Sequence, residues 1–541
     1  KISNKKLIIM IFSSKLHRLI YNLALAIILC ALPFSVFVVS VGLFTLTINF
    51  ILEGNWSYKY TSLKNNRALW VALIIYLPVL YSFFYTTNTN YAIKELRLWL
   101  PFLLIPPVIA LSKPLNKQEF KVLLALFVLS VLVGTLISTH YYFHSSNDQS
   151  LDVRQISKFI SHIRFALMIC LAIAILIHFT IIERVGNLSL RVGLIMVIVW
   201  LITFLFILQA LTGFVMLFLL VALGFTWYYY KSSGTIKRFV LLTFGLSFLF
   251  ILISIFMHKV DRFYTRNLID VKNLPEKTQN GNPYQHDTLR LVYENGNLLY
   301  INICYSELTN EWNKRSKSNF DGQTKNGQPI SQTLIRYLTS LGLTKDSVGV
   351  SKLDTLDVAL IESGATSILY KNKGFGLDLK LYQILWELES YRNEGSIGHS
   401  SIVQRLTYIK SALYAIKKNL WLGVGWGDIM SSLNTYYEEY NINLSPELRY
   451  MPHNQYLTVW VGAGLIGLIL FLVAMFYPFL STKKHKHFLP LYFFVLIMVS
   501  MLIEDTFETH IGISFAAIFS SLFIFGYSFS TSNNDPESIK G

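Results

Sequence analysis

Long hydrophobic stretches separated by short polar loops fill residues 1–257 and 454–529 of the chain. Each stretch has about 16 or more largely uncharged residues, close to the length that a helix needs to cross about 30 Å of hydrocarbon. The pattern predicts an all-α polytopic membrane protein with about twelve transmembrane helices. They are expected at 19–34, 36–52, 68–85, 96–111, 120–143, 163–182, 192–209, 211–230, 238–257, 454–479, 488–503 and 511–529.

The composition supports this interpretation. Hydrophobic residues make up 53% of the 541 positions and charged residues 14%, whereas soluble domains carry about 25% charged residues. A soluble enzyme and a disordered regulator are therefore excluded. The chain has three cysteines, two of them in apolar runs, which excludes a secreted disulfide scaffold.

The first hydrophobic stretch follows several lysines and so imitates a signal peptide. No A-x-A cleavage site comes after it, and the residues before Cys30 are not the small ones of a lipoprotein cleavage site. We therefore expect a retained membrane helix.

The basic residues predict the orientation, because cytoplasmic loops accumulate Lys and Arg. With the N-terminus inside, the inner loops hold Lys59, Lys64, Arg67, Lys113, Lys117, Lys121, Arg184, Arg191, Lys231, Lys237, Arg238, Lys483, Lys484 and Lys486. The outer loops hold Lys94, Arg97, Arg154, Lys158 and Arg164. Both termini are thus predicted to be cytoplasmic. The formal charge of +16 is mostly membrane-surface charge, so no nucleic-acid partner is expected.

Residues 258–453 have an ordinary soluble composition and are predicted to form a large outer α+β insertion between helices nine and ten. Alternating residues around Asn295-Gly296 predict a hairpin over 288–304, and helical patterns occur near 330–342, 378–392, 400–419 and 428–440. One hairpin with a few helices buries little surface, so we expect this segment to pack as a lid. The predicted divisions are transmembrane helices 1–257, outer domain 258–453, transmembrane helices 454–529 and cytoplasmic tail 530–541.

Helix ten opens with Pro452-His453-Asn454-Gln455-Tyr456 and continues into a glycine-rich stretch. Residue types alone favour a membrane-helix start, with Asn454 as the cap, Tyr456 in the aromatic belt and glycines that allow close packing. The alternative is that His453 exchanges a proton at the water–lipid boundary.

Arginines at the outer face are candidates for binding an anion. Arg405 lies on an outer helix, and Arg164 and Arg97 lie at the mouths of membrane helices. Each is able to snorkel or to clamp a phosphate bidentately. The glycine cluster before Asp428 predicts a tight reversal, with Asp428 as the cap of the next helix.

Glu504 and Asp505 follow helix eleven and are predicted either to orient an arginine or the histidine or to be solvated. No Cys/His cluster has zinc spacing and no Asp-x-Asp motif occurs, so no metal and no cofactor are predicted. The predicted membrane interiors hold almost no ionisable residue, which disfavours an ion-coupled transporter.

Taken together, Gln404-Arg405, Gly425-Trp426-Gly427-Asp428, Pro452–Leu457, Glu504-Asp505 and His162-Ile163-Arg164-Phe165 resemble the O-antigen ligase and polymerase superfamily of bacterial inner membranes. The likeness is greatest to long-loop ligase-like members from Bacteroidota. The order and sidedness of the motifs and the 48-residue interval from Arg405 to His453 fit that family over nearly the whole chain. His510 departs from it, because glutamine is expected there.

The resemblance implies a GT-C-type glycosyltransferase at the periplasmic face that needs neither metal nor nucleotide. It implies transfer of a glycan from undecaprenyl diphosphate to a lipid A–core sugar. It maps the catalytic base onto His453 and a diphosphate-binding arginine onto Arg405, with Arg262 or Arg266 as the second. An O-antigen polymerase, a protein O-oligosaccharyltransferase and a polysaccharide or lipid transporter remain alternatives.

Overall fold

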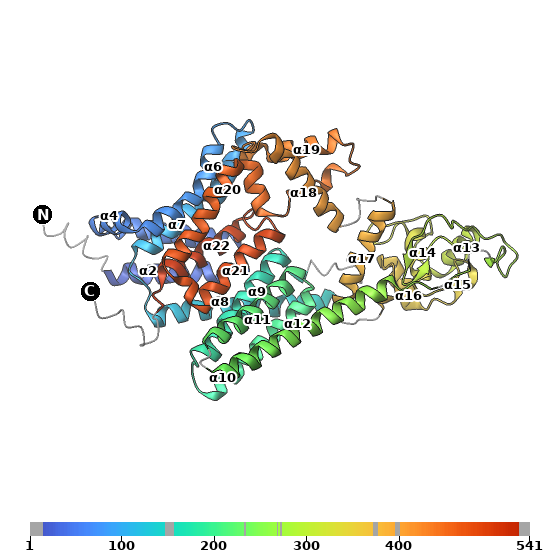
Figure 1. The fold of residues 1–541 in the computed structure, drawn as a ribbon, viewed down its shortest axis with the longest axis horizontal. Helices are drawn as coiled ribbons and strands as arrows, with labels where there is room; N and C mark the ends of the chain where they lie inside the picture. Colours follow the sequence, from blue (N-terminus) through green and yellow to red (C-terminus); the bar gives the residue numbers. More distant parts are fainter. Residues whose placement is uncertain are drawn as a thin grey trace. The chain divides into compact units, whose positions relative to one another are not determined.

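The structure, a computed structural model, describes residues 14–145, 156–231, 234–267, 269–270, 273–371, 377–394 and 401–529 (Figure 1). The tail 530–541, Arg154 and the lysines before residue 14 lie outside the described residues. Nearly all described secondary structure is helical, and the sheet consists of β1 (Tyr293–Glu294) and β2 (Asn297–Leu298). The prediction of an all-α membrane protein is confirmed at this level.

The chain divides into two compact units, which are described separately. The first comprises the described residues of 1–142, 154–233 and 405–541, and the second those of 143–153 and 234–404. Residues 405–453 thus cluster with the hydrophobic helices. The division into four parts stays a prediction.

The first unit is a bundle of helices that cover eleven of the twelve predicted hydrophobic stretches, whereas the stretch 238–257 lies in α12 (Thr235–Tyr264) of the second unit. Its helices before the outer segment are α2 (Ser14–Ala31), α3 (Val36–Leu52), α4 (Trp56–Asn65), α5 (Arg67–Leu73), α6 (Leu77–Ser82), α7 (Thr89–Leu111), α8 (Lys117–Ser145), α9 (His162–Ile177), α10 (Leu188–Leu208) and α11 (Leu211–Lys231). After it come α18 (Ser401–Lys418), of which residues 405–418 belong to this unit, the 3-10 turn η6 (Trp426–Asp428), α19 (Ile429–Glu439), α20 (Gln455–Ser481), α21 (Phe488–Ile503) and α22 (His510–Ser521).

Six helical segments in the described part of the chain are long and apolar enough to cross a membrane. They are Ser14–Ala31, Lys117–His144, His162–Ile182, Leu188–Leu208, Leu211–Tyr230 and Gln455–Ser481. A seventh results if α3 and α4, bent by 108°, count as one broken span. The apolar helices Arg67–Ser82, Phe488–Ile503 and His510–Gly526 are shorter. Twelve spans are therefore not confirmed, whereas a multi-pass membrane protein is supported.

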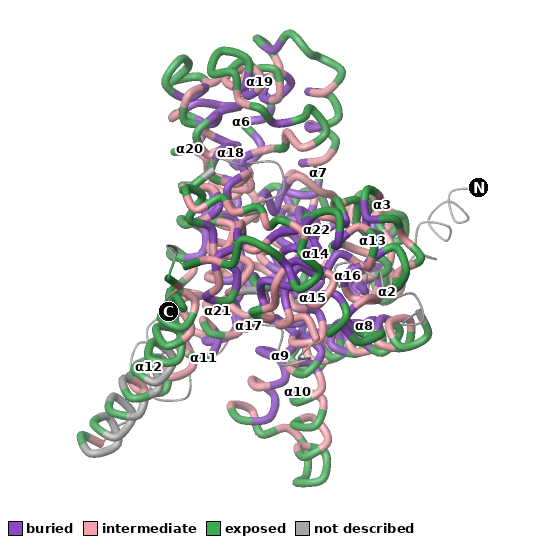
Figure 2. Tube along the Cα trace, turned by 90° about the vertical axis from the view of Figure 1, so that its right-hand side faces the viewer, coloured by how far each residue is buried: buried purple, intermediate pink, exposed green. Residues whose placement is uncertain are grey.

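Burial separates the central helices from the peripheral ones. In α9, 78% of the most apolar window is buried, whereas in α10 it is 17%, and Figure 2 shows α10 largely exposed. Since α10 is apolar apart from a few residues such as Arg191 in its first turn, its exposed apolar side chains suit lipid rather than water. Among the central contacts, α22 packs against α7, and α20 packs against α5 and α6.

An aromatic cluster connects the elements that surround the N-terminal half of α7. The Trp99 ring lies 5.3 Å from Trp426 of η6, 5.6 Å from Phe507 and 6.3 Å from Phe471 of α20, measured between ring centroids. All four side chains are almost completely buried. The cluster fixes the turn between α21 and α22 against α7 and α20.

Close backbone approach sets the position of α20. Gly464 has φ 68° and ψ −173°, which breaks the helix there. The loop at 420–425 takes up the freed groups: Val424 N donates to Val461 O (2.8 Å), Gly425 N to Gly462 O (2.9 Å), and Leu465 N to Leu420 O (2.9 Å). The glycines thus allow two backbones to form hydrogen bonds with each other. This approach is closer than the packing between helices that the sequence predicted.

Asp428 does not cap α19 with its side chain, so that prediction is wrong. Its carboxylate instead accepts hydrogen bonds from the backbone N–H groups of Thr87 (2.6 Å) and Asn88 (3.1 Å) and from the hydroxyls of Thr86 and Thr87. These hydrogen bonds are charge-assisted and therefore strong. Because the carboxylate of Asp428 accepts them, it is not available to cap the N–H groups at the start of α19.

The second unit has its own hydrophobic core, contrary to the expectation that the outer segment buries little. Its helices are α12 (Thr235–Tyr264), α13 (Tyr305–Arg315), α14 (Ile330–Ser340), α15 (Ser347–Ser351), α16 (Thr355–Ser363) and α17 (Leu377–Glu394). Leu308, Trp312, Leu334 and Tyr337 are fully buried in it. α13, α15 and α16 were not predicted, and they supply much of this core. A lid arrangement stays a prediction.

The predicted hairpin is present but short. Asn295 and Gly296 have φ 48° and 82°, the left-handed values of a type I′ turn, and the paired strands have two residues each. The four predicted helices correspond to α14, α17, α18 and α19, with bounds shifted by only a few residues.

We predict that Gly464→Ala destabilises the protein by about 3 kcal/mol or more, because a Cβ there would lie 2.2 Å from Trp421 O at a positive φ. Gly193→Ala in α10 is the matched control, since its Cβ would meet nothing within 4 Å. Thermal unfolding of both variants in detergent micelles measures the difference. Equal melting temperatures would show that the backbone contact is unimportant.

Candidate active site

His453 stands at the entrance to α20 in a strained backbone conformation, with φ 52°. A left-handed conformation is unusual for a residue other than glycine and costs energy that local contacts must offset. Two carboxylates supply those contacts. The backbone N–H of His453 donates to Asp505 Oδ2 (2.8 Å), and ring Nδ1 lies 3.1 Å from Glu504 Oε2.

The contact with Glu504 also fixes the tautomer of the ring. A carboxylate accepts hydrogen bonds, so in the neutral imidazole Nδ1 carries the proton and Nε2 keeps its lone pair. The rings of Tyr408 and Tyr450 lie 5.7 and 6.3 Å from the imidazole, measured between centroids. The arrangement orients one basic nitrogen of His453.

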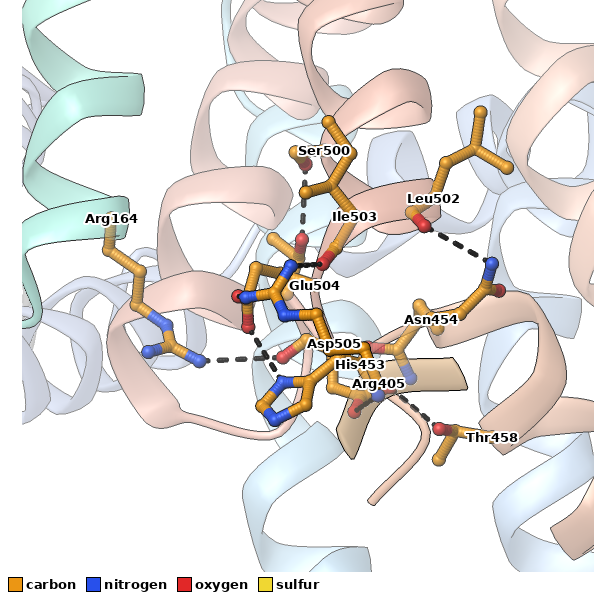
Figure 3. A network of polar contacts seen from close by, with 12 residues as sticks. Arg164, Arg405, His453, Asn454, Thr458, Ser500, Leu502, Ile503, Glu504 and Asp505 are labelled. Atoms are coloured by element: carbon orange, nitrogen blue, oxygen red, sulfur yellow. Dashed lines mark hydrogen bonds and ion pairs between the residues drawn. The ribbon is translucent and has the colours of Figure 1, made fainter. Parts of the chain in front are cut away.

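Glu504 joins His453 to Arg405 (Figure 3). Arg405 Nη2 donates to Glu504 Oε1 (2.6 Å), and Nη1 donates to the carbonyl oxygen of Ile503 (3.2 Å). The side chain of Glu504 is 12% exposed and that of Arg405 is 38% exposed. The carboxylate of Glu504 is thus mostly buried, while the guanidinium of Arg405 is still accessible to solvent.

The charge state of Glu504 follows from these neighbours. Burial opposes its ionisation, but the hydrogen bond from His453, the charge of that ring when it is protonated, and the positive charges of Arg405 and Arg164 outweigh burial. They hold the pKa of Glu504 below its ordinary value. Glu504 is therefore ionised at neutral pH.

Asp505 holds the backbone of His453 in place. Its carboxylate accepts from the hydroxyl of Thr458 (2.6 Å) and from His453 N, and the residue is 5% exposed. Its carbonyl oxygen lies 3.4 Å from Nη2 of Arg164, at the start of α9. The Nε of Arg164 is buried without a hydrogen-bond partner among the described residues, so this guanidinium keeps donor capacity.

The structure places the other predicted site residues as follows. Asn454 caps α20 by accepting from Tyr456 N and Leu457 N, and its amide donates to Leu502 O (3.2 Å). The hydroxyl of Tyr456 donates to Met498 O (2.8 Å). The capping role of Asn454 is confirmed, and both side chains hold α20 against α21. Asn454 and Tyr456 belong to the motif that resembles the O-antigen ligase superfamily, and the resemblance makes both candidates for binding substrate, which stays a prediction.

Arg262 and Arg266 belong to the second unit, whose contacts are described by themselves. Arg266 pairs with Glu389 (3.3 Å) and lies over the Tyr293 ring (4.2 Å). Arg262 lines a pocket with Lys259, Phe263, Asn295, Leu369, Leu381, Tyr382 and Leu385. Their role in binding diphosphate stays a prediction.

Sequence reasoning missed Thr458 and Gln455 as supports of the site, although a signal was present. Thr458 lies one helical turn after Asn454, on the same face, and Gln455 Oε1 accepts from Phe507 N (2.7 Å). Within the described residues no three His, Cys, Asp or Glu side chains group as metal ligands. The absence of a metal stays a prediction.

Residues 374–472 match the family model described as O-antigen ligase. This O-antigen ligase segment contains Arg405 and His453. The resemblance that the motifs indicated is therefore confirmed for residues 374–472, whereas Arg164, Glu504 and Asp505 lie outside the matched residues. A search of curated proteins finds no match.

We predict that Glu504→Gln lowers the free energy of unfolding of the protein by about 1.5–3 kcal/mol at neutral pH. This is the usual range for a charge-assisted hydrogen bond. The pKa of Glu504 is depressed in the folded protein, so its stabilisation is present above about pH 4.3 and is lost as the pH falls through the folded-state value. Melting curves of wild type and variant should converge in acid.

The exposed carboxylate of Glu447 provides the matched control. Glu447→Gln should leave the melting temperature unchanged at both pH values. A Glu504→Gln difference that persists undiminished in acid would contradict an ionic role for Glu504.

Proposed function

We propose that the protein is an O-antigen ligase-like glycosyltransferase of the GT-C type. It moves a glycan from undecaprenyl diphosphate to a sugar hydroxyl of lipid A–core at the periplasmic face of the bacterial inner membrane. The observation that carries the proposal is the pairing of His453 with Arg405 through Glu504, inside and beside the O-antigen ligase segment.

The reaction is a direct displacement with inversion at the anomeric carbon. The acceptor hydroxyl attacks that carbon, the bond to the diphosphate oxygen breaks, and the hydroxyl proton passes to Nε2 of His453. The contact of Nδ1 with Glu504 (3.1 Å) supports this assignment, because the carboxylate stabilises the imidazolium that forms.

The diphosphate leaves with growing negative charge, which Arg405 stabilises. A guanidinium carries five N–H donors, so Arg405 is able to hold a diphosphate oxygen while keeping its contacts with Glu504 and Ile503. Arg164 adds positive charge on the other side of Asp505, with Arg262 or Arg266 as the further ligand from the second unit. Fixed guanidinium charge takes the place of a metal ion.

An O-antigen polymerase shares this chemistry and differs in the acceptor, which is another lipid-linked repeat. A deletion strain distinguishes the two activities. Loss of a ligase leaves bare core with accumulated lipid-linked polymer, whereas loss of a polymerase leaves lipopolysaccharide with a single repeat. Transfer in vitro from purified lipid-linked glycan to lipid A–core, in the presence of EDTA, tests donor, acceptor and metal independence together.

We predict that His453→Ala lowers the rate of transfer by about 10²–10⁴-fold, the usual contribution of a general base, while donor binding remains. Transfer is measured in vitro and by complementation of a ligase-null strain, with Glu447→Gln as the control. Normal ligation by His453→Ala would overturn the assignment of the base.

Arg405→Lys should lower kcat/KM for the lipid-linked donor by about 10-fold or more. An ammonium does not reproduce the planar fork that contacts Glu504 and Ile503 and faces the diphosphate. Arg392→Lys, at an exposed position of α17, is the matched control. Near-normal transfer by Arg405→Lys would remove the diphosphate role of Arg405.

A further inference from the structure

The helix α4 leaves the end of α3 at a sharp angle. α3 has 17 residues, which is at the short end of the range that crosses the hydrocarbon of a bilayer. Large apolar side chains along it are exposed, among them Phe37, Phe44 and Leu52, and such side chains suit lipid rather than water. The axis of α4 is bent from that of α3 by 108°, close to a right angle. Where α3 spans a bilayer, α4 therefore runs along the bilayer surface.

The corner between the two helices is fixed by backbone and side-chain contacts. Gly54 and Asn55 have φ 70° and 55°, left-handed values that turn the chain out of the helix direction. Lys59 of α4 is almost completely buried and folds back onto the last turn of α3. Its ammonium donates to the carbonyl oxygen of Phe50 (2.6 Å) and lies 3.0 Å from Oε2 of Glu53. Because a cation stabilises the carbonyl groups at a helix C-terminus, these contacts hold α4 at its angle.

One face of α4 carries aromatic side chains and lies toward the end of α3. Trp56, Tyr60 and Leu63 share that face by their helical spacing, and the ring centroids of Trp56 and Phe50 are 6.1 Å apart. Trp56 and Tyr60 are nevertheless 54% and 69% exposed. Trp and Tyr gather where hydrocarbon meets headgroups, because their rings are apolar with one polar edge. The opposite face is mostly polar and carries Ser57, Tyr58, Thr61 and Asn65.

Two positive charges lie next to this aromatic face. Lys64 in the last turn of α4 and Arg67 in the first turn of α5 are exposed, whereas the nearby carboxylate of Glu53 is paired with Lys59. At a membrane surface the phosphates of anionic lipids attract Lys and Arg, and each such residue strengthens binding about fivefold. The charge of α4 thus complements an anionic headgroup layer.

We propose that α4 is an interfacial helix that binds the headgroup layer of anionic lipids. Trp56 and Tyr60 lie at the edge of the hydrocarbon, and Lys64 and Arg67 bind lipid phosphates. α4 thereby anchors the end of α3 at a set depth in the bilayer. This role is independent of glycosyl transfer, and the sequence had predicted only that the basic residues belong to an inner loop.

Spin labels on the two faces of α4 test its position in a bilayer. In a background with Cys30→Ala, Cys170→Ala and Cys304→Ala, a nitroxide is attached at Tyr60→Cys or, as the matched control on the other face, at Thr61→Cys. In nanodiscs that contain phosphatidylglycerol, the label at residue 60 should collide more with lipid-soluble oxygen than with a water-soluble nickel complex. The label at residue 61 should show the reverse preference.

Three outcomes of this experiment overturn the proposal. A preference for the nickel complex at both positions places α4 in water, and a preference for oxygen at both places it inside the bilayer as part of a span. Protection of residue 60 from both reagents places the aromatic face of α4 against protein.

The binding of anionic lipid has a separate readout that keeps the native cysteines. Vesicles of phosphatidylcholine and phosphatidylglycerol carry bromine on one lipid or on the other, and the emission of Trp56 is obtained by subtracting a matched Trp56→Phe protein. Brominated phosphatidylglycerol should quench this emission at least about twofold more than brominated phosphatidylcholine, because the two cations enrich the anionic lipid near α4. The double variant Lys64→Gln/Arg67→Gln should bring the ratio to about one.

Lys314→Gln, at an exposed position of α13, is the control and should leave the quenching ratio unchanged. Equal quenching by the two lipids in wild type overturns the binding of anionic lipid. Emission of Trp56 that neither brominated lipid quenches overturns the interfacial position as well.

Discussion

The carboxylate of Glu504 holds the site together, because it is hydrogen-bonded on one side to the guanidinium of Arg405 and on the other to the imidazole of His453. It comes from a different element than either partner, since it follows α21, whereas Arg405 lies on α18 and His453 precedes α20. An anion between two potential cations keeps both in fixed orientation, and its own burial is offset by their charge. The same contact gives His453 one basic nitrogen.

Such an arrangement requires rigid support, which the backbone of the first unit supplies. The loop at 420–425 runs directly against the broken part of α20, where Gly464 leaves no side chain between the two backbones. The carboxylate of Asp428 then ties the same region to residues 86–88. The distance between α18 and α20, and therefore between Arg405 and His453, is set by hydrogen bonds between backbones rather than by adaptable side chains.

Behind the site, aromatic and polar groups share one buried region. Trp99 and Trp426 pack edge to face with each other, and their indole N–H groups face the carboxyl of Glu95. The apolar faces of these rings stabilise the contact between α7 and η6.

The sequence by itself determined where most of the hydrophobic helices lie, the hairpin turn at Asn295-Gly296 and the cap at Asn454, because hydrophobic period, turn chemistry and capping act over a few neighbouring residues. It did not reveal the core of the second unit, since α13, α15 and α16 show weak local patterns and gain their stability from mutual burial. It also misassigned Asp428, whose carboxylate is used by a loop more than 300 residues away. Only the tertiary structure decided that Glu504 pairs with both Arg405 and His453, because these contacts join segments whose separation in sequence carries no local signal.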